Sequence, residues 1–232
     1  MANFLFEAFR DDVCILYEND FRDIIDNIQF DFIITDPPYN VNYKYPDFDD
    51  NLSSEKYIEL LRPLKDHKII MINYAESFCG DIRDSIGKPK RCVFWCYSSS
   101  LLRQSRMIAW YNCKPNFNLV KQSYKDTKDK RIIKAIEKGS TGCRIYDWWS
   151  DIQTVKNVSK EKCKSFTNQI PIKLLERIIL LTTKPNDIIL DPFFGSGSIY
   201  FACKNTGRKC IGIEKSNRHI NCFFERLKKN DF

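Results

Sequence analysis

The chain has 232 residues, of which 43% are apolar, enough for one α/β core with an insertion but not for two full domains. It contains no run of eighteen apolar residues, and acids stand in its first segment where a signal peptide needs a basic stretch and an apolar core. We therefore expect a cytoplasmic protein without a membrane partner. The net charge of +7 favours an anionic partner.

The first half of the chain alternates short strands with helices. "VCILY" at 13–17 predicts a strand. Apolar residues then recur at helical spacing from Phe21 to Ile28, which predicts an amphipathic helix capped by Asn19 or Asp20. Further strands are predicted at 30–36, 68–73 and 91–97, with a helix at 57–61, whereas 99–111 fits either type.

The second half resumes this alternation after a Lys-rich break at 112–165 that lacks a long apolar face. Pro171 suits the first position of a helix whose apolar face runs from Leu174 to Ile179. The last predicted elements are a strand at 187–190, a helix at 198–205, a strand at 209–214 and a helix at 216–227. Such alternation predicts an α/β fold with a doubly wound, mostly parallel sheet. Residues 1–111 and 166–232 form its one domain, and 112–165 are an inserted segment.

The cysteines and histidines of the chain indicate neither a disulfide framework nor a metal site. The ten cysteines are scattered through apolar stretches such as "RCVFWCY", which favours buried free thiols over a disulfide framework. The chain has only two histidines and no Cys-x-x-Cys pair, so we expect no metal site.

The excess positive charge lies in one segment. Residues 114–164 hold 13 Lys and Arg against 6 Asp and Glu, an excess equal to the net charge of the whole chain. Aromatic residues, among them Tyr146 and Trp148, stand between these charges and can pack against sugars or bases. This mixture predicts a phosphate-facing patch, with a solvated basic surface as the alternative. The predicted contacts to nucleic-acid phosphates are Lys121, Lys125, Lys128, Lys130, Arg131 and Arg144.

A glycine-rich turn follows the strand at 187–190. In "DPFFGSGS", Gly195 and Gly197 permit a tight turn and a close approach of the backbone to a ligand. Glu214 ends the following strand, where an acid can accept both hydroxyls of a ribose. The turn can also be a plain connection, and Glu214 can instead cap the helix that begins at Ser216. Together they predict a nucleoside-containing cofactor, and the short glycine motif argues against a pyrophosphate.

A second apolar run ends in "DPPYN". Each proline fixes its φ and lacks an N–H, so the loop is stiff, and Pro37 and Pro38 donate no backbone hydrogen bond. The carboxylate of Asp36 and the carbonyl of Pro37 are then acceptors suited to an NH2 group, and the ring of Tyr39 offers a face for a planar base. Such a loop can aim an amino nitrogen at an electrophile.

Both motifs, in this order, resemble those of the β-class DNA amino-methyltransferases, which use S-adenosylmethionine. In that family Asp-Pro-Pro-Tyr precedes the recognition region and Asp-Pro-Phe-x-Gly-Ser-Gly comes last, as "DPPYN" at 36–40 and "DPFFGSG" at 191–197 do here. "YENDFRDII", "YDWWSDI" and "GRKCIGIEKSNRHINCFFERL" are similar to further family segments. The resemblance covers 13–40 and 146–227.

The resemblance implies a Rossmann-like, site-specific DNA methyltransferase that acts on a base flipped out of double-stranded DNA. It favours adenine N6 over cytosine N4, because the family's cytosine enzymes more often carry Ser at the position of Asp36. The implied catalytic residues are Asp36, Pro37, Pro38 and Tyr39. The implied cofactor-binding residues are Asp20, Asp36, Asn168, Gln169, Asp191, Phe193, Gly195, Ser196, Gly197 and Glu214.

The chain also departs from the family pattern. Where the family often has His-Pro-Thr-Gln-Lys-Pro, this chain has "FTNQIP", so Phe166 and Ile170 replace a histidine and a lysine. Contacts to the methionine end of the cofactor then fall to Asn168 and Gln169. Asn19 stands where a glycine is usual.

Other functions explain less of the sequence. A nucleotide-dependent oxidoreductase accounts for the glycine turn but not for "DPPY", and an inactive DNA-binding protein has no use for either Asp-Pro motif. An RNA or protein amino-methyltransferase shares the Pro-Pro-Tyr chemistry but usually places the cofactor motif first. The sequence leaves open a homodimer and, within a restriction-modification system, a cognate restriction enzyme as partners.

Overall fold

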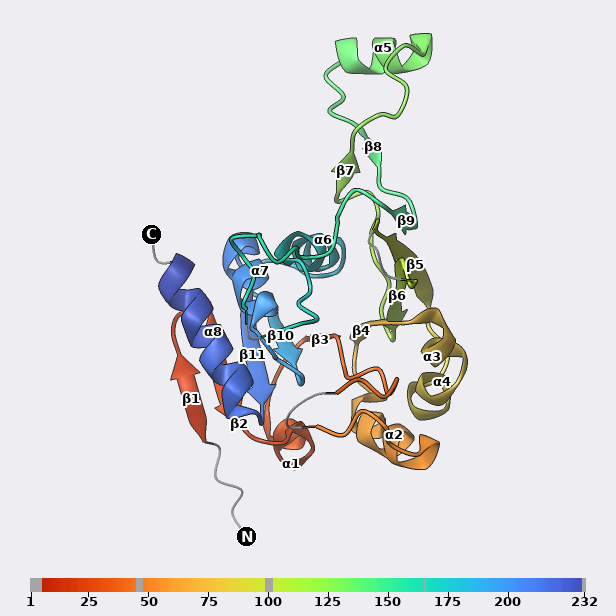
Figure 1. Cartoon of the computed structure of the whole chain (residues 1–232). Coiled ribbons are helices and arrows are strands. Elements are labelled where there is room, and N and C mark those ends of the chain that lie inside the picture. The colour runs from red at the N-terminus through yellow and green to blue at the C-terminus, as the bar shows by residue number, and fades with distance from the viewer. Residues whose placement is uncertain (1–5, 45–47, 99–101, 165, 231–232) are drawn as a thin grey trace.

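A mostly parallel sheet of nine strands organises the protein (Figure 1). This computed structural model describes residues 6–44, 48–98, 102–164 and 166–230. The strand order is β1-β2-β11-β10-β3-β4-β6-β5-β9. The strands are β1 (Glu7–Arg10), β2 (Cys14–Glu18), β3 (Phe32–Thr35), β4 (Ile69–Asn73), β5 (Arg91–Cys96), β6 (Ser105–Tyr111), β9 (Trp148–Trp149), β10 (Ile188–Asp191) and β11 (Lys209–Glu214).

Five adjacent strands at the centre of the sheet, β2, β11, β10, β3 and β4, are mutually parallel. The predicted α/β fold with a mostly parallel sheet is therefore confirmed. Both ends of the sheet depart from it: β1 is antiparallel to β2, and β6 is antiparallel to β4 and β5. Because the central strands are parallel, their carboxyl ends meet at one edge, where ligands bind in doubly wound sheets.

Helices cover both faces of this sheet. They are α1 (Phe21–Ile24), α2 (Ser54–Leu61), α3 (Ala75–Cys79), α4 (Asp81–Ile86), α6 (Ile172–Thr182), α7 (Ser198–Thr206) and α8 (Asn217–Asn230), with short 3-10 turns at Ile25–Asn27 and Arg62–Leu64. Alternate strand residues enter different cores. Ile34 and Ile70 pack with α6, α7 and α8, whereas Ile33 and Ile69 pack with α1, α2 and α4. Strands buried on both faces explain the unbroken apolar runs in the sequence.

The structure corrects two local predictions and assigns part of a segment that the sequence left ambiguous. The helix that begins at Phe21 ends at Ile24 and continues only as a 3-10 turn; of the two candidate caps, Asn19 and Asp20, it is Asp20 that caps it. Pro171 is the N-cap of α6 rather than its first helical residue, because its ψ of 135° is extended. Of the segment left ambiguous, 105–111 form strand β6, and 99–101 lie outside the described residues.

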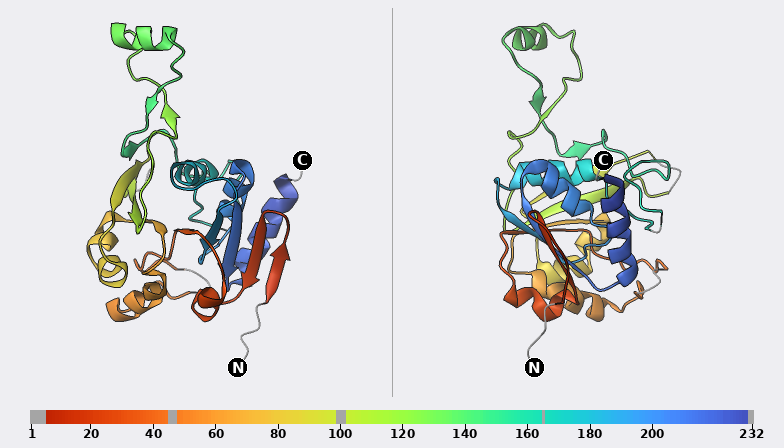
Figure 2. Two further views of the ribbon diagram at one scale, coloured as in Figure 1. Left: turned by 180° about the vertical axis from the view of Figure 1, so that it is seen from behind. Right: turned by 90° about the vertical axis from the view of Figure 1, so that its left-hand side faces the viewer.

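The predicted insertion at 112–165 has two structural parts. The first is an arm in which a two-stranded ribbon, β7 (Lys121–Gln122) and β8 (Cys143–Arg144), carries helix α5 (Lys130–Glu137) at its tip. The arm projects beyond the sheet in every view (Figures 1 and 2). The second part returns to the sheet, because Trp149 in β9 is 1% exposed and pairs with β5.

The arm leaves the sheet at the edge opposite the carboxyl ends of the central strands. It follows Tyr111, the last residue of β6, and Tyr111 pairs with Ile69 at the start of β4.

Among the helices of the described ranges, none is both long and apolar enough to cross a membrane.

Candidate active site

A cavity of about 450 Å³ opens at the carboxyl edge of the sheet and brings the two Asp-Pro motifs together. Its size is that of a pocket for a small organic ligand. The predicted residues that line it are Asp20, Asp36, Pro37, Pro38, Tyr39, Asn168, Phe193, Gly195 and Glu214. These residues come from segments as far apart in the chain as α1 and β11, so the cavity is a product of the fold.

Asp36 follows directly after β3 and lies on the cavity wall. The hydroxyl of Tyr39 donates a hydrogen bond to its Oδ1. Loss of solvent around the carboxyl raises the pKa of Asp36 to about 6, although Arg106 and the bond from Tyr39 act to lower it. A carboxyl with this pKa is ionised at neutral pH and can still take up a proton.

The loop after Asp36 is fixed by hydrogen bonds from two directions. The hydroxyl of Tyr57 in α2 donates to the carbonyl of Pro38 at 2.6 Å. The buried carboxylate of Asp50 accepts hydrogen bonds from the backbone N–H groups of Asn40, Val41 and Tyr43 at 2.8, 3.0 and 2.9 Å. Three such bonds to one carboxylate hold the loop in a single shape.

Arg106 is a cavity residue that the sequence reasoning missed. It lies in β6, within the segment that fitted either a helix or a strand, and only 8% of it is exposed. Its guanidinium carbon lies 5.2 Å from the ring centroid of Tyr39. Burial acts to lower the pKa of Arg106, but Tyr39 and Asp36 outweigh burial and raise it. Arg106 is therefore a permanent cation beside the Asp36 carboxylate.

The glycine turn forms the opposite wall. Gly195 has a φ of +55°, and its N–H donates to Oε2 of Glu214 at 2.8 Å. Gly197 has a φ of +74°, and a Cβ there would lie 2.4 Å from a ring carbon of Phe223. A Cβ at Gly195 would lie 2.9 Å from a ring carbon of Phe166, so both positions favour glycine, one to let Phe166 pack against the turn and the other to let α8 do so.

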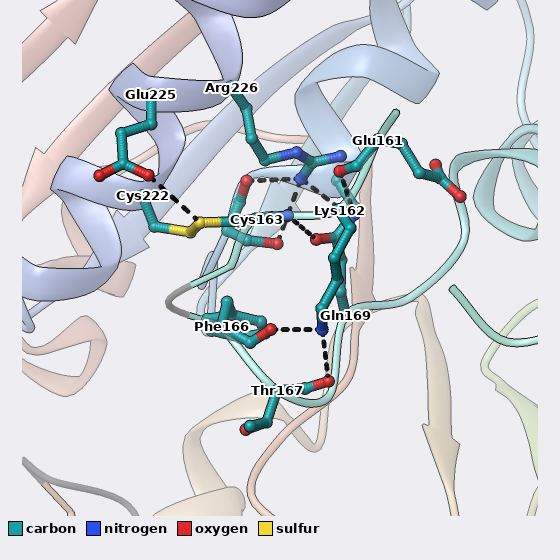
Figure 3. The surroundings of a disulfide bond; sticks show 11 residues. Glu161, Lys162, Cys163, Phe166, Thr167, Gln169, Cys222, Glu225 and Arg226 are labelled. Carbon is teal, nitrogen blue, oxygen red and sulfur yellow. Dashed lines mark hydrogen bonds between the residues drawn. A yellow bond between two sulfur atoms is a disulfide. The ribbon is translucent and has the colours of Figure 1, made fainter. Parts of the chain in front are cut away.

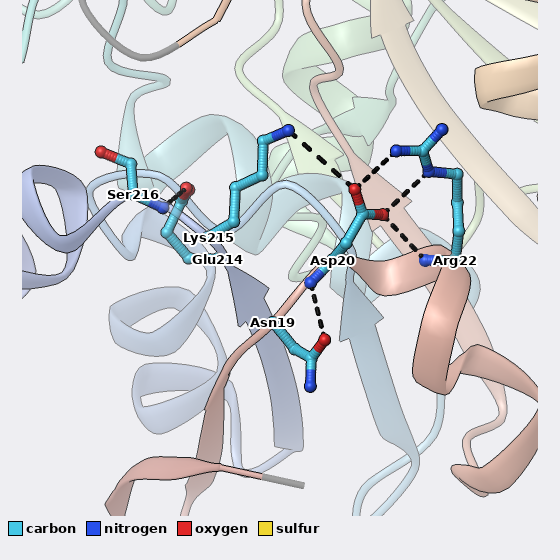
Figure 4. A network of polar contacts seen from close by, with 6 residues as sticks. All are labelled: Asn19, Asp20, Arg22, Glu214, Lys215 and Ser216. Atoms are coloured by element: carbon cyan, nitrogen blue, oxygen red, sulfur yellow. Dashed lines mark hydrogen bonds and ion pairs between the residues drawn. The ribbon is translucent and has the colours of Figure 1, made fainter. Parts of the chain in front are cut away.

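Glu214 holds the turn and the start of α8 together. Besides the bond from Gly195, its Oε1 accepts from the N–H of Ser216 at 2.8 Å, a contact drawn in Figure 4. The alternative role considered for Glu214, a cap for the last helix, is thus present in the structure. The two roles are compatible, because each carboxylate oxygen has two lone pairs and Glu214 also lines the cavity.

Asp20 also lines the cavity, and Figure 4 shows its contacts with Arg22 and Lys215. Its carboxylate accepts from the Nε of Arg22 at 2.9 Å and from the Nη2 at 2.6 Å, and the Nζ of Lys215 lies 3.9 Å away. The side-chain hydrogen bond from Arg22 is the main cause that lowers the pKa of Asp20. Asp20 is thus a fixed acceptor at the cavity rim.

Four predicted cofactor residues lie outside the cavity lining and act behind it. Oδ1 of the Asp191 carboxyl group accepts from the hydroxyl of Thr35 and from the N–H of Phe193. The carbonyl of Ser196 accepts from the Nη1 of Arg226 at 2.6 Å. Gly197 begins α7. Gln169 is buried, with its amide bonded to the backbone of Cys163 and Glu161.

The segment before α6 closes the cavity beside the glycine turn. Phe166, at the position of the missing family histidine, packs edge-on against the ring of His219 with 4.9 Å between centroids, and both residues line the cavity. Lys162 fixes this segment, because its Nζ donates to the carbonyls of Phe166 and Thr167 (Figure 3). Ile170 is buried in the core, so it offers no contact to a ligand.

One expectation about cysteine was wrong. Cys163 and Cys222 form a disulfide that ties this segment to α8 (Figure 3), whereas all the cysteines were expected to be free thiols. The two residues are 59 positions apart in the sequence and meet only because the segment packs on the helix. Eight other cysteines are free, of which Cys14, Cys203 and Cys210 are buried as predicted.

The predicted DNA contacts lie together on the arm and its base, away from the cavity. Lys121 is in β7, Arg144 in β8, and Lys130 and Arg131 open α5 behind the cap Asp129. Lys125 and Lys128 lie in the loop between β7 and α5 and are exposed. At the base of the arm, the Nζ of Lys125 lies 5.8 Å from the ring centroid of Tyr146 and 5.5 Å from that of Trp148. Both rings are about half exposed.

Known proteins share this sequence pattern. A family model described as DNA methylase matches residues 30–225. The chain is 30% identical over 223 residues to the Type II methyltransferase M.HpaI of Haemophilus parainfluenzae, covering 85% of this chain and 68% of that protein. It is 27% identical over 241 aligned residues to M.BglII of Bacillus subtilis, covering 88% and 65%. The chain thus spans about two thirds of the length of these relatives.

Solved structures share the fold. The crystal structure of the M1.HpyAVI-SAM complex superposes with a TM-score of 0.62 at 23% identity, covering 92% of this chain and 98% of that one. The cytosine-N4-specific PvuII DNA methyltransferase superposes with a TM-score of 0.71 at 16% identity, covering 98% and 91%. With a family model matched over most of its length and a relative as similar as M.HpaI, the chain belongs to the DNA methylase family.

Proposed function

We propose that the protein transfers a methyl group from S-adenosylmethionine to the exocyclic amino group of a base in double-stranded DNA. Adenine N6 is the favoured acceptor and cytosine N4 the alternative. The observation that carries this proposal is the single cavity whose lining includes both the Asp36 loop and the Gly195 turn. One loop offers acceptors for an amino group, and the other offers a backbone turn and an acid for a nucleoside.

The cofactor half of the cavity fits a nucleoside with a short cationic tail. Glu214 has lone pairs left for ribose hydroxyls, and Asp20 can accept from an adenine amino group. The rings of Phe21 and Phe193, with centroids 5.1 Å apart, give this half an apolar wall. Asn168 supplies a polar group for the methionine end. Asp191, Ser196, Gly197 and Gln169 hold these residues in place from behind.

The base half needs the base to leave the duplex, because the stack hides the amino group. Asp36 and the carbonyl of Pro37 accept its two N–H bonds, and the ring of Tyr39 lies beside them. The hydroxyl of Tyr39 now donates to Asp36, so an incoming amino group shares or replaces that bond. Held in this way, the nitrogen directs its lone pair toward the cofactor half.

S-adenosylmethionine supplies a methyl carbon on a sulfonium; as the base nitrogen bonds to this carbon, the carbon–sulfur bond breaks and the sulfur keeps the electron pair. The nitrogen then carries a positive charge and one proton too many. Asp36 accepts this proton and passes it to solvent, and its pKa of about 6 suits a weak base. The step requires no covalent bond to the enzyme.

The arm is our proposed contact to the DNA backbone. Its exposed cations can pair with phosphates, and Tyr146 and Trp148 can pack against sugars or bases.

The names of the relatives, Type II methyltransferases, support a restriction-modification setting. Sedimentation with and without DNA tests for a homodimer, and cleavage of unmodified DNA by extracts of the source cells tests for a cognate restriction enzyme.

Mass spectrometry of nucleosides tests the acceptor. Unmethylated genomic DNA and, in parallel, RNA are incubated with the protein and S-adenosylmethionine. We expect N6-methyladenine in DNA. N4-methylcytosine would keep the mechanism and change the base, whereas methylation of RNA alone would replace DNA as the substrate. Unmodified nucleosides in both, with cofactor bound, would contradict the proposed function.

A further inference from the structure

Arg106 is a buried, charged residue with a hydrogen-bond donor that the described residues leave unused. Arg106 lies near the start of β6, where it pairs with Trp95 of β5. Its guanidinium carbon lies 5.5 Å from the ring centroid of Trp95 and 5.2 Å from the ring centroid of Tyr39. Within the described part of the chain, its Nε–H has no hydrogen-bond partner. A buried donor left without an acceptor costs free energy, so such a group in a ligand cavity points to a missing acceptor.

Packing alone does not account for this residue. A methionine would fill the space between Tyr39 and Trp95 without burying a charge. The guanidinium instead lies beside the acceptors of the Asp36 loop, and Arg106 and Asp36 both line the cavity. The base half of the cavity therefore contains a donor next to its acceptors.

We propose that Arg106 is a further base-contacting residue, whose Nε–H donates to the unprotonated ring nitrogen next to the amino group of the flipped base. This inference rests on the proposed function and deepens it, because it names what selects the base. Adenine has N1 beside its N6 amino group, and cytosine has N3 beside its N4 amino group. Both therefore present one donor and one acceptor side by side.

Guanine and thymine present the reverse pattern on the same edge, a carbonyl oxygen beside a ring N–H. Against Asp36 and Arg106, their carbonyl would face a carboxylate and their N–H would face a cation. Each mismatch leaves buried polar groups unpaired, which discriminates more strongly than shape does. The pair thus selects adenine or cytosine and rejects the other two bases.

A double-mutant cycle, in which Arg106 is changed in the protein and the ring nitrogen is changed in the target base, tests the contact. The substrates are duplexes that carry the mapped target site with either the normal base or its deaza analogue, 1-deazaadenine for an adenine target and 3-deazacytosine for a cytosine target. For the wild-type protein, the analogue is expected to lower kcat/KM roughly 10- to 100-fold, the range for a hydrogen bond to a charged group. For Arg106→Met, the same exchange is expected to have little effect. Loss of base pairing in the duplex affects both proteins equally and cancels in the ratio.

Arg103→Met is the matched control, because Arg103 lies on the ring of Tyr74, 4.2 Å from its centroid, and is half exposed outside the cavity lining. Its penalty for the analogue should equal that of the wild type. Cofactor titration and thermal melting show whether each variant folds. If Arg106→Met does not fold, Arg106→Lys carries the test, because lysine keeps the charge but not the Nε donor, and the penalty should shrink.

The outcomes separate the two proposals. A penalty of full size in the folded Arg106 variant would show that the ring nitrogen is not read by Arg106 and would overturn this inference alone. An analogue that the wild-type protein methylates as well as the normal base would do the same. A wild-type protein that methylates neither adenine nor cytosine would overturn the proposed function, and this inference with it.

Discussion

Thr35 donates a hydrogen bond from its Oγ1 to Oδ1 of Asp191 at 2.9 Å, although 156 positions separate the two residues in the sequence. Thr35 ends β3 and Asp191 ends β10, and these two strands are parallel neighbours that lead into the two Asp-Pro loops. One buried bond therefore sets the spacing between the base half and the cofactor half of the cavity.

The same bond leads to a prediction about stability. Burial raises the pKa of Asp191 to about 7, against the hydrogen bonds from Thr35 and Phe193 that lower it. The folded carboxyl thus keeps its proton up to about pH 7, while an unfolded one loses it near 3.8. Its contribution to stability is full below the unfolded value and is lost as the pH rises through the folded one.

Asp191→Asn should therefore melt at a higher temperature than the wild type at about pH 8, because the amide accepts the same hydrogen bonds without a buried charge. The difference should shrink toward about pH 5, where the wild-type carboxyl is protonated. Melting without cofactor at both pH values measures this. The opposite result, in which the melting temperature of the variant relative to the wild type is lower at about pH 8 than at about pH 5, would show that the ionised carboxylate is favourably paired in the folded protein.

Methyl transfer should have an acidic limb set by Asp36. Its carboxylate must be ionised to accept from the amino group, and its pKa is about 6. The single-turnover rate should be level above that value and fall about tenfold for each pH unit below it. Cofactor affinity measured over the same range separates this effect from loss of binding. A rate that stays level to about pH 5 would remove Asp36 from the proton-accepting role.

The arm should supply much of the affinity for DNA. Replacement of Lys125, Lys128, Lys130 and Arg131 with Ala removes four exposed cations and should weaken binding. The salt dependence of log K should also flatten, by up to about 0.9 for each phosphate that the variant no longer neutralises. Fluorescence anisotropy at several salt concentrations measures both quantities.

A control with the same loss of charge replaces Lys173 of α6, Lys204 of α7, and Lys228 and Lys229 of α8, all of which are exposed. These changes should leave the salt slope near that of the wild type. Equal effects of the two sets would mean that only net charge matters and that the arm is not a binding surface.

Glu214→Ala should weaken binding of S-adenosylmethionine at least roughly tenfold, because it removes the ribose acceptor and frees the N–H groups of Gly195 and Ser216. Calorimetry measures the dissociation constant. Glu18→Ala is the control: Glu18 pairs with Glu214 across β2 and β11 but does not line the cavity. An unaltered constant in Glu214→Ala would leave this acid with its capping role alone.

The sequence predicted the two loops well because their chemistry is local. Proline, glycine and an acid at the end of a strand define what the backbone can do there, and Asp36, Gly195 and Glu214 all line one cavity. The same local reasoning named Asp20 as one of two candidate caps, and Asp20 is the cap in the structure. The alternation of elements then predicted the parallel sheet that aligns these strand ends.

Contacts made by the fold were beyond this reasoning. Arg106 lay in a segment of unclear periodicity, and only the pairing of β6 with β4 and β5 places it beside Asp36. Gln169 looked like a ligand residue, yet packing turns its amide toward the backbone of its own segment. The direction of the arm depends on where β6 ends, which no composition or motif reveals.

Transfer of a tritium-labelled methyl group from S-adenosylmethionine into unmethylated DNA, compared between the wild type and Asp36→Ala, tests the central claim most directly. Cofactor affinity is measured for both proteins. We predict label in DNA with the wild type and none with the variant, while both bind the cofactor. Equal labelling by the two proteins, or no labelling by a wild type that binds the cofactor, would contradict the account.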